Sequence, residues 1–229
     1  MKYYSLLIFF FIMSLHAFSQ FGASFKLNLQ YAQTQRPGLE SYFAEMSDSM
    51  HIASVLDISS GFGFGLGFLG GGEHAEFEAG GSFTRFADEV GSDTSNLLYY
   101  INSDITYYFG MNYLPVNFFL IGGSFIINSA NGKSNASGPA QGDRFLESLP
   151  SVDFHFLRGY SVALRAQSGF YIYLNKDHGN RMRLTAYYIY GLSNYNFYTV
   201  SEKRLADFTG DQKTGYTTFG IELAVMWGL

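Results

Sequence analysis

Eight charged residues share one face of the chain in segments where apolar and polar side chains alternate. Four are cations and four are carboxylic acids: Lys26, Glu76, Glu78, Asp104, Arg165, Arg181, Arg183 and Glu222. Burying an unpaired charge is costly, so charges enclosed in a fold must pair. The balanced set predicts a structural salt-bridge network. Lys26 and Glu222 are predicted to pair because they belong to the first and last predicted strands. A proton or anion pathway along the same face is the alternative.

The histidines show no spacing typical of a metal site. Beyond the first nineteen residues they are His51, His74, His155 and His178, and no two are four residues apart on one predicted element. Asp153 and His155 fall in a long predicted connection, where membrane-surface hydrolases place catalytic groups. A hydrolase also needs a nucleophile that converges on the base, and no motif marks such a serine. We therefore predict no catalytic residue and no metal.

One glycine-rich segment resembles a cofactor motif. Residues 65–70 (GLGFLG) match the spacing of a dinucleotide-binding loop, but such a loop must open a helix whose N-terminus meets the phosphate. Here residues 71–73 lead into another predicted strand, so we predict no cofactor. The glycines alternate with apolar residues and would leave room for long side chains from neighbouring strands. They are Gly61, Gly63, Gly65 and Gly67.

The elements that would position these residues are strands. Along residues 21–31 the odd positions are apolar or aromatic, and the even positions are polar or glycine. Residues 218–229 repeat the alternation, with apolar side chains at every odd position from Phe219 to Leu229. A strand directs successive side chains to opposite faces, so each segment would have one apolar and one polar face.

Eight segments of this kind follow one another, and each supplies the ~9–11 residues with which a tilted strand crosses a bilayer. They are residues 21–32, 58–69, 74–87, 97–109, 117–128, 160–175, 181–194 and 215–228. The connections between them alternate between mostly long (33–57, 88–96, 129–159, 195–214) and short (70–73, 110–116, 176–180). Outer-membrane barrels combine an even strand number with short periplasmic turns and longer external loops. The sequence therefore predicts an all-β fold, an eight-stranded antiparallel up-and-down transmembrane β-barrel with long external loops. The count would change if residues 150–157 paired as an extra strand.

The composition agrees with a surface that meets lipid and excludes several other classes. Only 14% of residues are charged and 19% are aromatic, yet the mean hydropathy is +0.02, as alternating apolar and polar residues would give. The net charge of −5 and the lack of basic clusters argue against nucleic acid as a partner. The chain has no cysteine, which excludes disulfides, thiol catalysis, Cys-based zinc sites and a lipoprotein anchor.

The N-terminus has the pattern of a signal peptide. Met1 and Lys2 give a positive start, residues 6–15 form an apolar run, and Ala17 and Ser19 place small residues before a cut ahead of Gln20. The alternative is a membrane anchor, but the run is shorter than the ~20 residues of a spanning helix. We predict a signal peptide over residues 1–19 and a single barrel over residues 20–229.

Aromatic residues lie close to the predicted strand ends, where rings with a polar tip favour the headgroup zone. The predicted periplasmic rim holds Tyr107, Tyr108, Phe109, Tyr171, Tyr173 and Trp227, and the external rim holds Tyr31, Tyr99, Tyr195 and Tyr216.

The first long connection has a helical period after Pro37 and Gly38. Its apolar residues recur at i, i+3, i+4 and i+7, at Leu39, Tyr42, Phe43 and Met46. This pattern predicts either a loop that packs on itself or an interfacial helix that forms a partial lid.

Two short motifs resemble one known family. Phe21-Gly22 followed by Leu27-Asn28-Leu29 resembles the first strand of PorT-like outer-membrane β-barrel proteins, and residues 188–194 (YIYGLSN) resemble their penultimate strand. The resemblance extends over most of the chain after the signal peptide. It implies insertion by the outer-membrane assembly machinery but no single activity, although some members assist protein secretion or gliding. The chain departs from many outer-membrane proteins by ending in Gly228-Leu229, and Trp227 would replace the usual terminal aromatic residue.

The expected location is the outer membrane, with membrane lipid, the assembly machinery and an unidentified external or envelope partner as contacts. The leading hypothesis is a non-enzymatic barrel that is structural or binds a partner through external loops. The alternatives are a transporter or secretion factor, and a membrane-surface lipid or peptide hydrolase. A soluble lipocalin-like barrel would need an apolar interior, which the charges on the polar face contradict.

Overall fold

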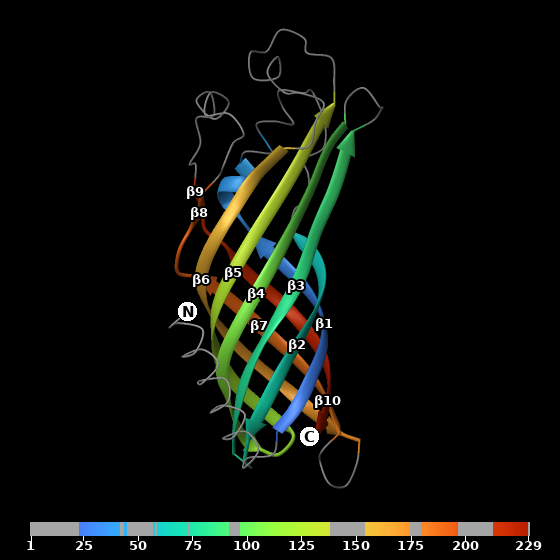
Figure 1. Cartoon of the computed structure of the whole chain (residues 1–229), viewed down its shortest axis with the longest axis vertical. Coiled ribbons are helices and arrows are strands. Elements are labelled where there is room, and N and C mark those ends of the chain that lie inside the picture. The colour runs from blue at the N-terminus through green and yellow to red at the C-terminus, as the bar shows by residue number, and fades with distance from the viewer. Residues whose placement is uncertain are drawn as a thin grey trace, which may run out of the picture.

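Eight antiparallel strands close into one barrel in the computed structural model, in the order β1-β10-β7-β6-β5-β4-β3-β2 (Figure 1). The structure describes residues 23–41, 44, 57, 59–72, 74–91, 97–137, 154–174, 180–196 and 213–228. The barrel strands are β1 (Ala23–Gln35), β2 (Ser60–Gly71), β3 (Ala75–Gly91), β4 (Leu97–Val116), β5 (Phe119–Ser137), β6 (Phe154–Tyr173), β7 (Arg181–Gly191) and β10 (Thr217–Gly228). A separate two-stranded ribbon pairs β8 (Tyr195–Asn196) with β9 (Lys213–Thr214). The predicted eight-stranded all-β barrel is confirmed. The predicted signal peptide, residues 1–19, lies outside the described residues.

The two ends of the barrel differ in their connections. At one end, called here the short-turn end, neighbouring strands are joined by residues 72–74, 117–118 and 174–180. At the other, the long-connection end, the joining segments are 36–59, 92–96, 138–153 and 192–216. β1 begins and β10 ends at the short-turn end (Figure 1). This is the alternation that the sequence predicts.

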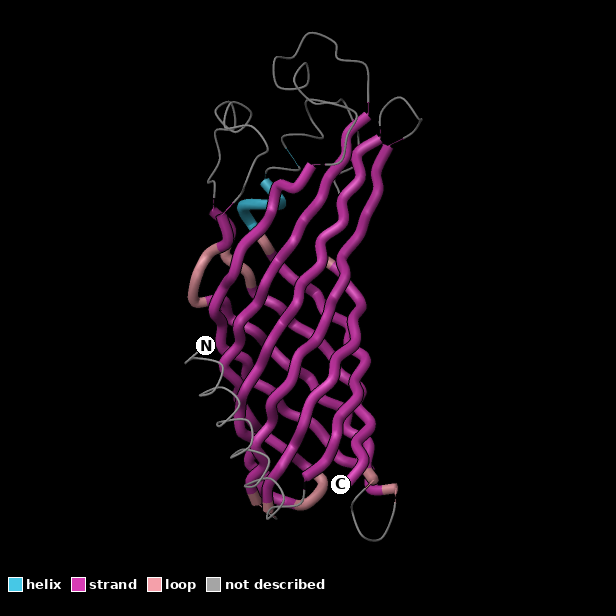
Figure 2. The backbone as a smooth tube through the Cα atoms, in the orientation of Figure 1, coloured by secondary structure: helices cyan, strands magenta, loops and turns pink. Residues whose placement is uncertain are grey.

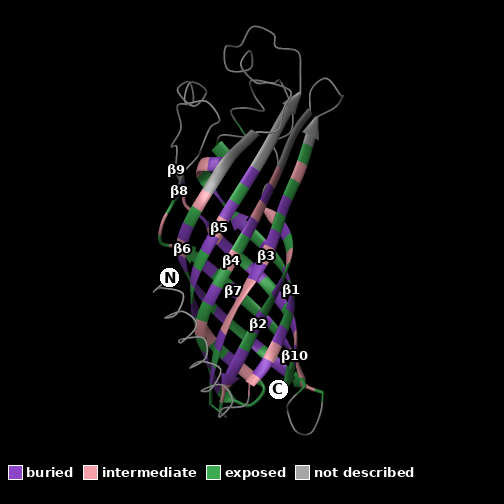
Figure 3. Cartoon of the chain, in the orientation of Figure 1, coloured by how far each residue is buried: buried purple, intermediate pink, exposed green. Residues whose placement is uncertain are grey.

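Pairing of β1 with β10 closes the barrel and fixes which residues face each other across the seam. Lys26 lies opposite Met226, and Gln30 lies opposite Glu222. Along both strands, side chains alternate between buried and exposed (Figure 3). The buried members are largely polar and the exposed members largely apolar, so the interior is the polar side. The alternation that predicts the strands therefore also decides which face is enclosed.

Four neighbouring strands extend beyond the rest at the long-connection end (Figure 2). β3 to β6 have 17, 20, 19 and 20 residues, whereas β1, β2, β7 and β10 have 13, 12, 11 and 12. Pairing of β3 with β2 ends at Phe86, and pairing of β6 with β7 begins at Ala163. We call the remaining part the projecting sheet; it consists of residues 87–91, 97–103, 131–137 and 154–162.

Several predicted boundaries are wrong because strands continue through segments expected to be connections. β4 runs on to Val116, so the turn before β5 is only residues 117–118 and not 110–116. Glycine and asparagine at 110 and 112 suggest a turn, but they continue the ladder with β3 and β5. Within the expected connection 129–159, residues 129–137 continue β5 and residues 154–159 begin β6, so residues 154–157 belong to β6 itself and not to an extra strand. His155 therefore lies in a strand, opposite Lys133.

The segment after β1 is helical over residues 37–41 and at residue 44. Leu39, within this turn, is fully buried, whereas Tyr42, Phe43 and Met46 lie outside the described residues. Among the described residues, no helix is long and apolar enough to cross a membrane.

Candidate functional site

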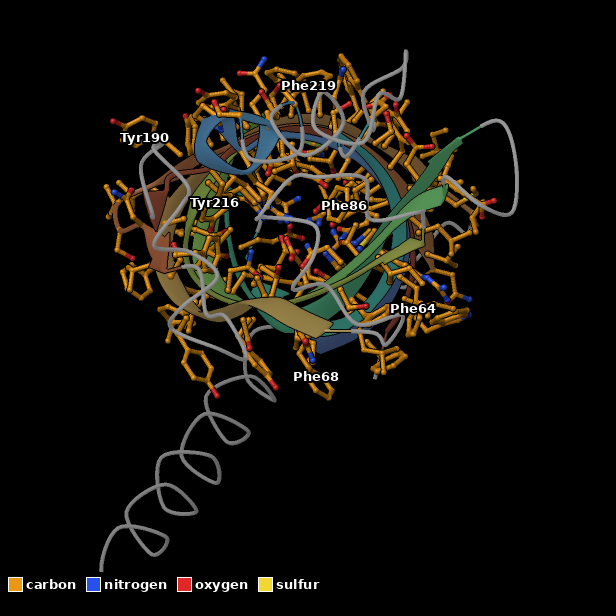
Figure 4. The ribbon with its side chains drawn as sticks, turned by 90° about the horizontal axis from the view of Figure 1, so that it is seen from above. Phe64, Phe68, Phe86, Tyr190, Tyr216 and Phe219 are labelled. Atoms are coloured by element: carbon orange, nitrogen blue, oxygen red, sulfur yellow. The ribbon has the colours of Figure 1, made fainter. Side chains whose placement is uncertain are left out.

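The outward surface of the barrel is an apolar band with aromatic residues. Seen along the barrel axis, Phe64, Phe68, Tyr190 and Phe219 point away from the interior (Figure 4). Aliphatic side chains also face outward; Leu29 and Ile172, for example, have 63% and 60% of their surface exposed. A closed barrel with such a band has the surface that outer-membrane barrels present to lipid.

Four of the aromatic residues predicted for the rims are instead buried in the interior. Tyr108, Tyr171, Tyr195 and Tyr216 are each at most 4% exposed. Tyr107 and Phe109 flank Tyr108 and are exposed, as strand alternation requires. Nearness to a strand end is therefore not enough to place an aromatic side chain in the headgroup zone.

Five charged side chains from five strands meet in the middle of the barrel. This central charge cluster consists of Lys26 (β1), Glu78 (β3), Arg165 (β6), Arg183 (β7) and Glu222 (β10), and each is at most 5% exposed. Glu222 accepts hydrogen bonds from Lys26 at 2.9 Å and from Arg183 at 2.8 Å through one carboxylate oxygen. Arg165 Nη2 lies 3.3 Å from the other carboxylate oxygen of Glu222. Glu78 accepts a hydrogen bond from Lys26, and both of its carboxylate oxygens accept hydrogen bonds from Arg183 at 2.8 Å.

Amide side chains occupy the remaining positions around the two carboxylates. Asn28 donates to Glu222 at 3.0 Å, and Asn112 and Gln167 donate to Glu78 at 3.1 and 3.3 Å. Buried ions are tolerated when additional hydrogen bonds satisfy their remaining lone pairs. The cluster therefore has the hydrogen bonds that a stable enclosed ion network needs.

The short-turn end of the interior is closed by a second ion pair and an apolar layer. Arg181 bonds to Glu76, Tyr171 donates its hydroxyl to the same carboxylate, and the Arg181 guanidinium lies 4.5 Å from the Tyr171 ring centre. Beside Tyr171 lies an apolar cluster that includes Leu69, Leu114, Leu120, Ala224 and Met226. These buried apolar side chains fill the interior at the short-turn end of the barrel.

The long-connection end contains an ion pair that the sequence did not indicate. Arg36 follows β1 directly and turns inward, where its guanidinium bonds to Asp104 and lies 5.1 Å from the Phe86 ring centre. Asn102 and Asn128 donate to the same carboxylate at 2.6 and 3.3 Å. Arg36 is 1% exposed although it lies outside every strand. Strand alternation, which identified the other charges, says nothing about such a residue.

The inner-face glycines accommodate side chains from other strands of the barrel. A Cβ atom added to any of six of these glycines would lie less than 3.0 Å from a ring or polar group of another strand. The pairs are Gly61 with Phe86, Gly63 with Thr84, Gly65 with Asn28, Gly67 and Gly80 with Tyr108, and Gly220 with Tyr187. Residues 65–70 lie in β2 and lead through a short turn into β3, so the segment is not a dinucleotide-binding loop.

Between the central charge cluster and the Arg36–Asp104 pair lies a cavity of about 20 Å³, which we call the interior chamber. Its wall combines residues that carry hydroxyl or amide groups with three apolar residues, Ala32, Phe86 and Ile189, and with one cation and one carboxylate, Arg165 and Asp104. The polar wall includes Gln30, Thr34, Ser82, Thr84, Thr106, Asn128, Tyr187, Tyr216 and Thr218. A space of this size suits about one water-sized species.

The eight predicted charges all lie on the inner side of the barrel, and five of them converge in one cluster. Lys26 and Glu222 are within hydrogen-bonding distance, although they are four residues apart in the β1–β10 register. The predicted balance of charge does not hold once Arg36 is included, because the described interior then has five cations and four carboxylates.

In the described part of the chain, no three histidine or acidic side chains are grouped to hold a metal. His74 is exposed in a turn, and His51, Asp153 and His178 lie outside the described residues.

Comparisons with known proteins return remote matches among solved structures of outer-membrane proteins. No protein-family model and no curated protein sequence matches it. The outer membrane protein OprG from Pseudomonas aeruginosa is 12% identical with a TM-score of 0.49, and the match covers 91% of this chain and 97% of OprG. Ail of Yersinia pestis is 10% identical (TM-score 0.47, covering 90% and 99%), and Neisserial surface protein A is 10% identical (0.43, 90% and 97%). With identities of 10–12% and TM-scores below 0.5, no argument about the fold or the function of this chain rests on these matches.

Proposed function

We propose that this protein is a small, non-enzymatic barrel of the outer membrane that binds a partner outside the cell through its projecting sheet. The apolar outer band supports the membrane location. The short turns would lie in the periplasm and the long connections outside, as in other outer-membrane barrels. Membrane lipid then surrounds the band, and the assembly machinery inserts the chain from the periplasmic side.

The filled interior argues against an open channel. An eight-stranded barrel is just wide enough for side chains to fill it, and here the central charge cluster spans it from β1 to β6. The apolar layer around Leu114 and Leu120 closes the short-turn end. Ion pairs and packed side chains thus occupy the space that a transport pathway would need.

The projecting sheet is the single observation that carries the binding proposal. Five or more residues in each of its four strands extend past the neighbouring strands β2 and β7. A structure that only had to span the membrane would have no need of this extra length, since β1, β2, β7 and β10 cross with 11–13 residues. Surfaces held on a rigid scaffold are where binding functions concentrate.

Site-specific photo-crosslinking on intact cells tests the proposal. The chain has no cysteine, so single cysteines can carry a crosslinker at Glu89 and Ser103 of the projecting sheet, and at Ile172 of the lipid-facing band as the matched control. We expect a discrete protein or polysaccharide adduct from the first two sites and not from Ile172. Equal adducts at all three sites, or none at Glu89 and Ser103, would contradict partner binding by this sheet.

A further inference from the structure

The central charge cluster holds more positive than negative charge. Lys26, Arg165 and Arg183 share two carboxylates, Glu78 and Glu222, and all five groups are enclosed. The other two interior ion pairs are each balanced and involve different residues, Arg36 with Asp104 and Arg181 with Glu76. One positive charge in the middle of the barrel therefore has no carboxylate of its own among the described residues.

That surplus lies mainly on Arg165. Its ion pair with Glu222, at 3.3 Å, is longer than the bonds that Lys26 and Arg183 make to the same carboxylate. Its Nε, like that of Arg183, is buried with no hydrogen-bond partner among the described residues, but Arg165 lacks the three bonds of 2.8 Å that Arg183 makes to Glu78 and Glu222. The ring centres of Tyr187 and Tyr108 lie 4.2 and 5.8 Å from the guanidinium. Aromatic rings attract a cation but do not neutralise it.

Arg165 is also the cation that lines the interior chamber. The hydroxyl groups of Ser82 and Thr84 line the same cavity and can donate to an acceptor placed there. The one carboxylate of the wall, Asp104, is paired with Arg36 and accepts from two asparagines. The chamber thus combines an incompletely neutralised guanidinium, neutral donors and room for one small species.

We propose that the interior chamber binds one small inorganic anion, of chloride or bromide size, against Arg165. The chamber has room for about one water-sized species, and chloride and bromide are only slightly larger than a water molecule. The ion supplies the charge that the two shared carboxylates lack, so it stabilises the folded barrel. This site goes beyond the proposed partner binding and does not depend on it.

Urea unfolding in matched salts measures the binding. The protein is refolded in zwitterionic detergent and unfolded in sodium chloride, sodium bromide or sodium gluconate at equal ionic strength, with Trp227 fluorescence as the signal. Gluconate is too large for the chamber. We expect the unfolding equilibrium constant in halide to be about tenfold lower than in gluconate once the halide reaches ten times its Kd. Arg165→Gln should lose this difference, whereas Arg181→Gln, at the short-turn end, should keep it.

A second variant keeps the proposal testable if Arg165→Gln does not fold. Gln30 lines the chamber and lies opposite Glu222, so Gln30→Glu would place a fixed carboxylate where the ion binds. This variant should unfold at the same midpoint in halide and in gluconate. Crystals grown in bromide should show an anomalous peak within hydrogen-bonding distance of the Arg165 guanidinium. Equal stability of the unaltered protein in halide and gluconate, or a bromide crystal with only water in the chamber, would overturn the proposal.

Discussion

Glu78 is the residue whose neutralisation should damage the barrel interior most. Its carboxylate accepts hydrogen bonds from Lys26, from Arg183 through both oxygens, and from the side-chain amides of Asn112 and Gln167. Glu78→Gln keeps the shape of the side chain but removes its charge. The central charge cluster would then hold three buried cations around one carboxylate, Glu222.

The magnitude follows from the burial of these partners. Lys26 and Arg183 are both 0% exposed, and removing one member of a buried ion pair costs roughly 3–5 kcal/mol of folding free energy. Because Glu78 serves two cations, we expect a loss toward the upper part of that range. With an m-value of about 2 kcal/mol per molar urea, the unfolding midpoint should fall by about 2 M.

The assay is urea unfolding of the refolded barrel, followed by Trp227 fluorescence and by the gel mobility of unheated samples. Glu89→Gln, on an exposed part of β3, is the matched control and should unfold within about 0.5 kcal/mol of the unaltered protein. The double variant Glu78→Gln with Arg183→Gln should recover part of the loss, because it removes a cation together with the anion. If Glu78→Gln unfolds at the midpoint of Glu89→Gln, or if the Glu78 and Arg183 changes are additive, the cluster is not a coupled ion network.

Three further predictions concern the seam, the topology and the lumen. Lys26→Met and Glu222→Gln should each lower the urea midpoint, and the double variant should be less destabilised than the sum of the two; additive losses would show that the pair across β1 and β10 is not coupled. On intact cells, a single cysteine at Glu89 should react with a membrane-impermeant thiol reagent and one at Gly72 should not, whereas the reverse result would invert the assigned orientation. In planar bilayers the purified protein should give no stable stepwise conductance, because ion pairs and the apolar layer fill the barrel; reproducible steps would refute the closed interior.

Alternation in the sequence determined the strand number, their order along the chain and the face on which each residue lies. It could do so because a strand sends successive side chains to opposite sides, so a local pattern fixes the face without knowledge of the partner strand. The same reasoning placed Lys26, Glu78, Arg183 and Glu222 on the inner side. It failed at strand ends such as β4, where Gly110 and Asn112 suggest a turn although they continue the ladder to Val116.

Tertiary structure alone decided which inner residues meet. Lys26 lies opposite Met226, yet its ammonium reaches Glu222 four residues away and Glu78 on the other side, because strand tilt and stagger offset residues that share a level in the barrel. Arg36 belongs to no strand, so no alternation could place it, and only the inward turn of the segment after β1 brings it to Asp104. The surplus charge near Arg165, and the chamber beside it, likewise arise from residues of several strands brought together by closure. A periodic pattern encodes the face of each strand, whereas contacts depend on stagger and closure, which are properties of the whole barrel.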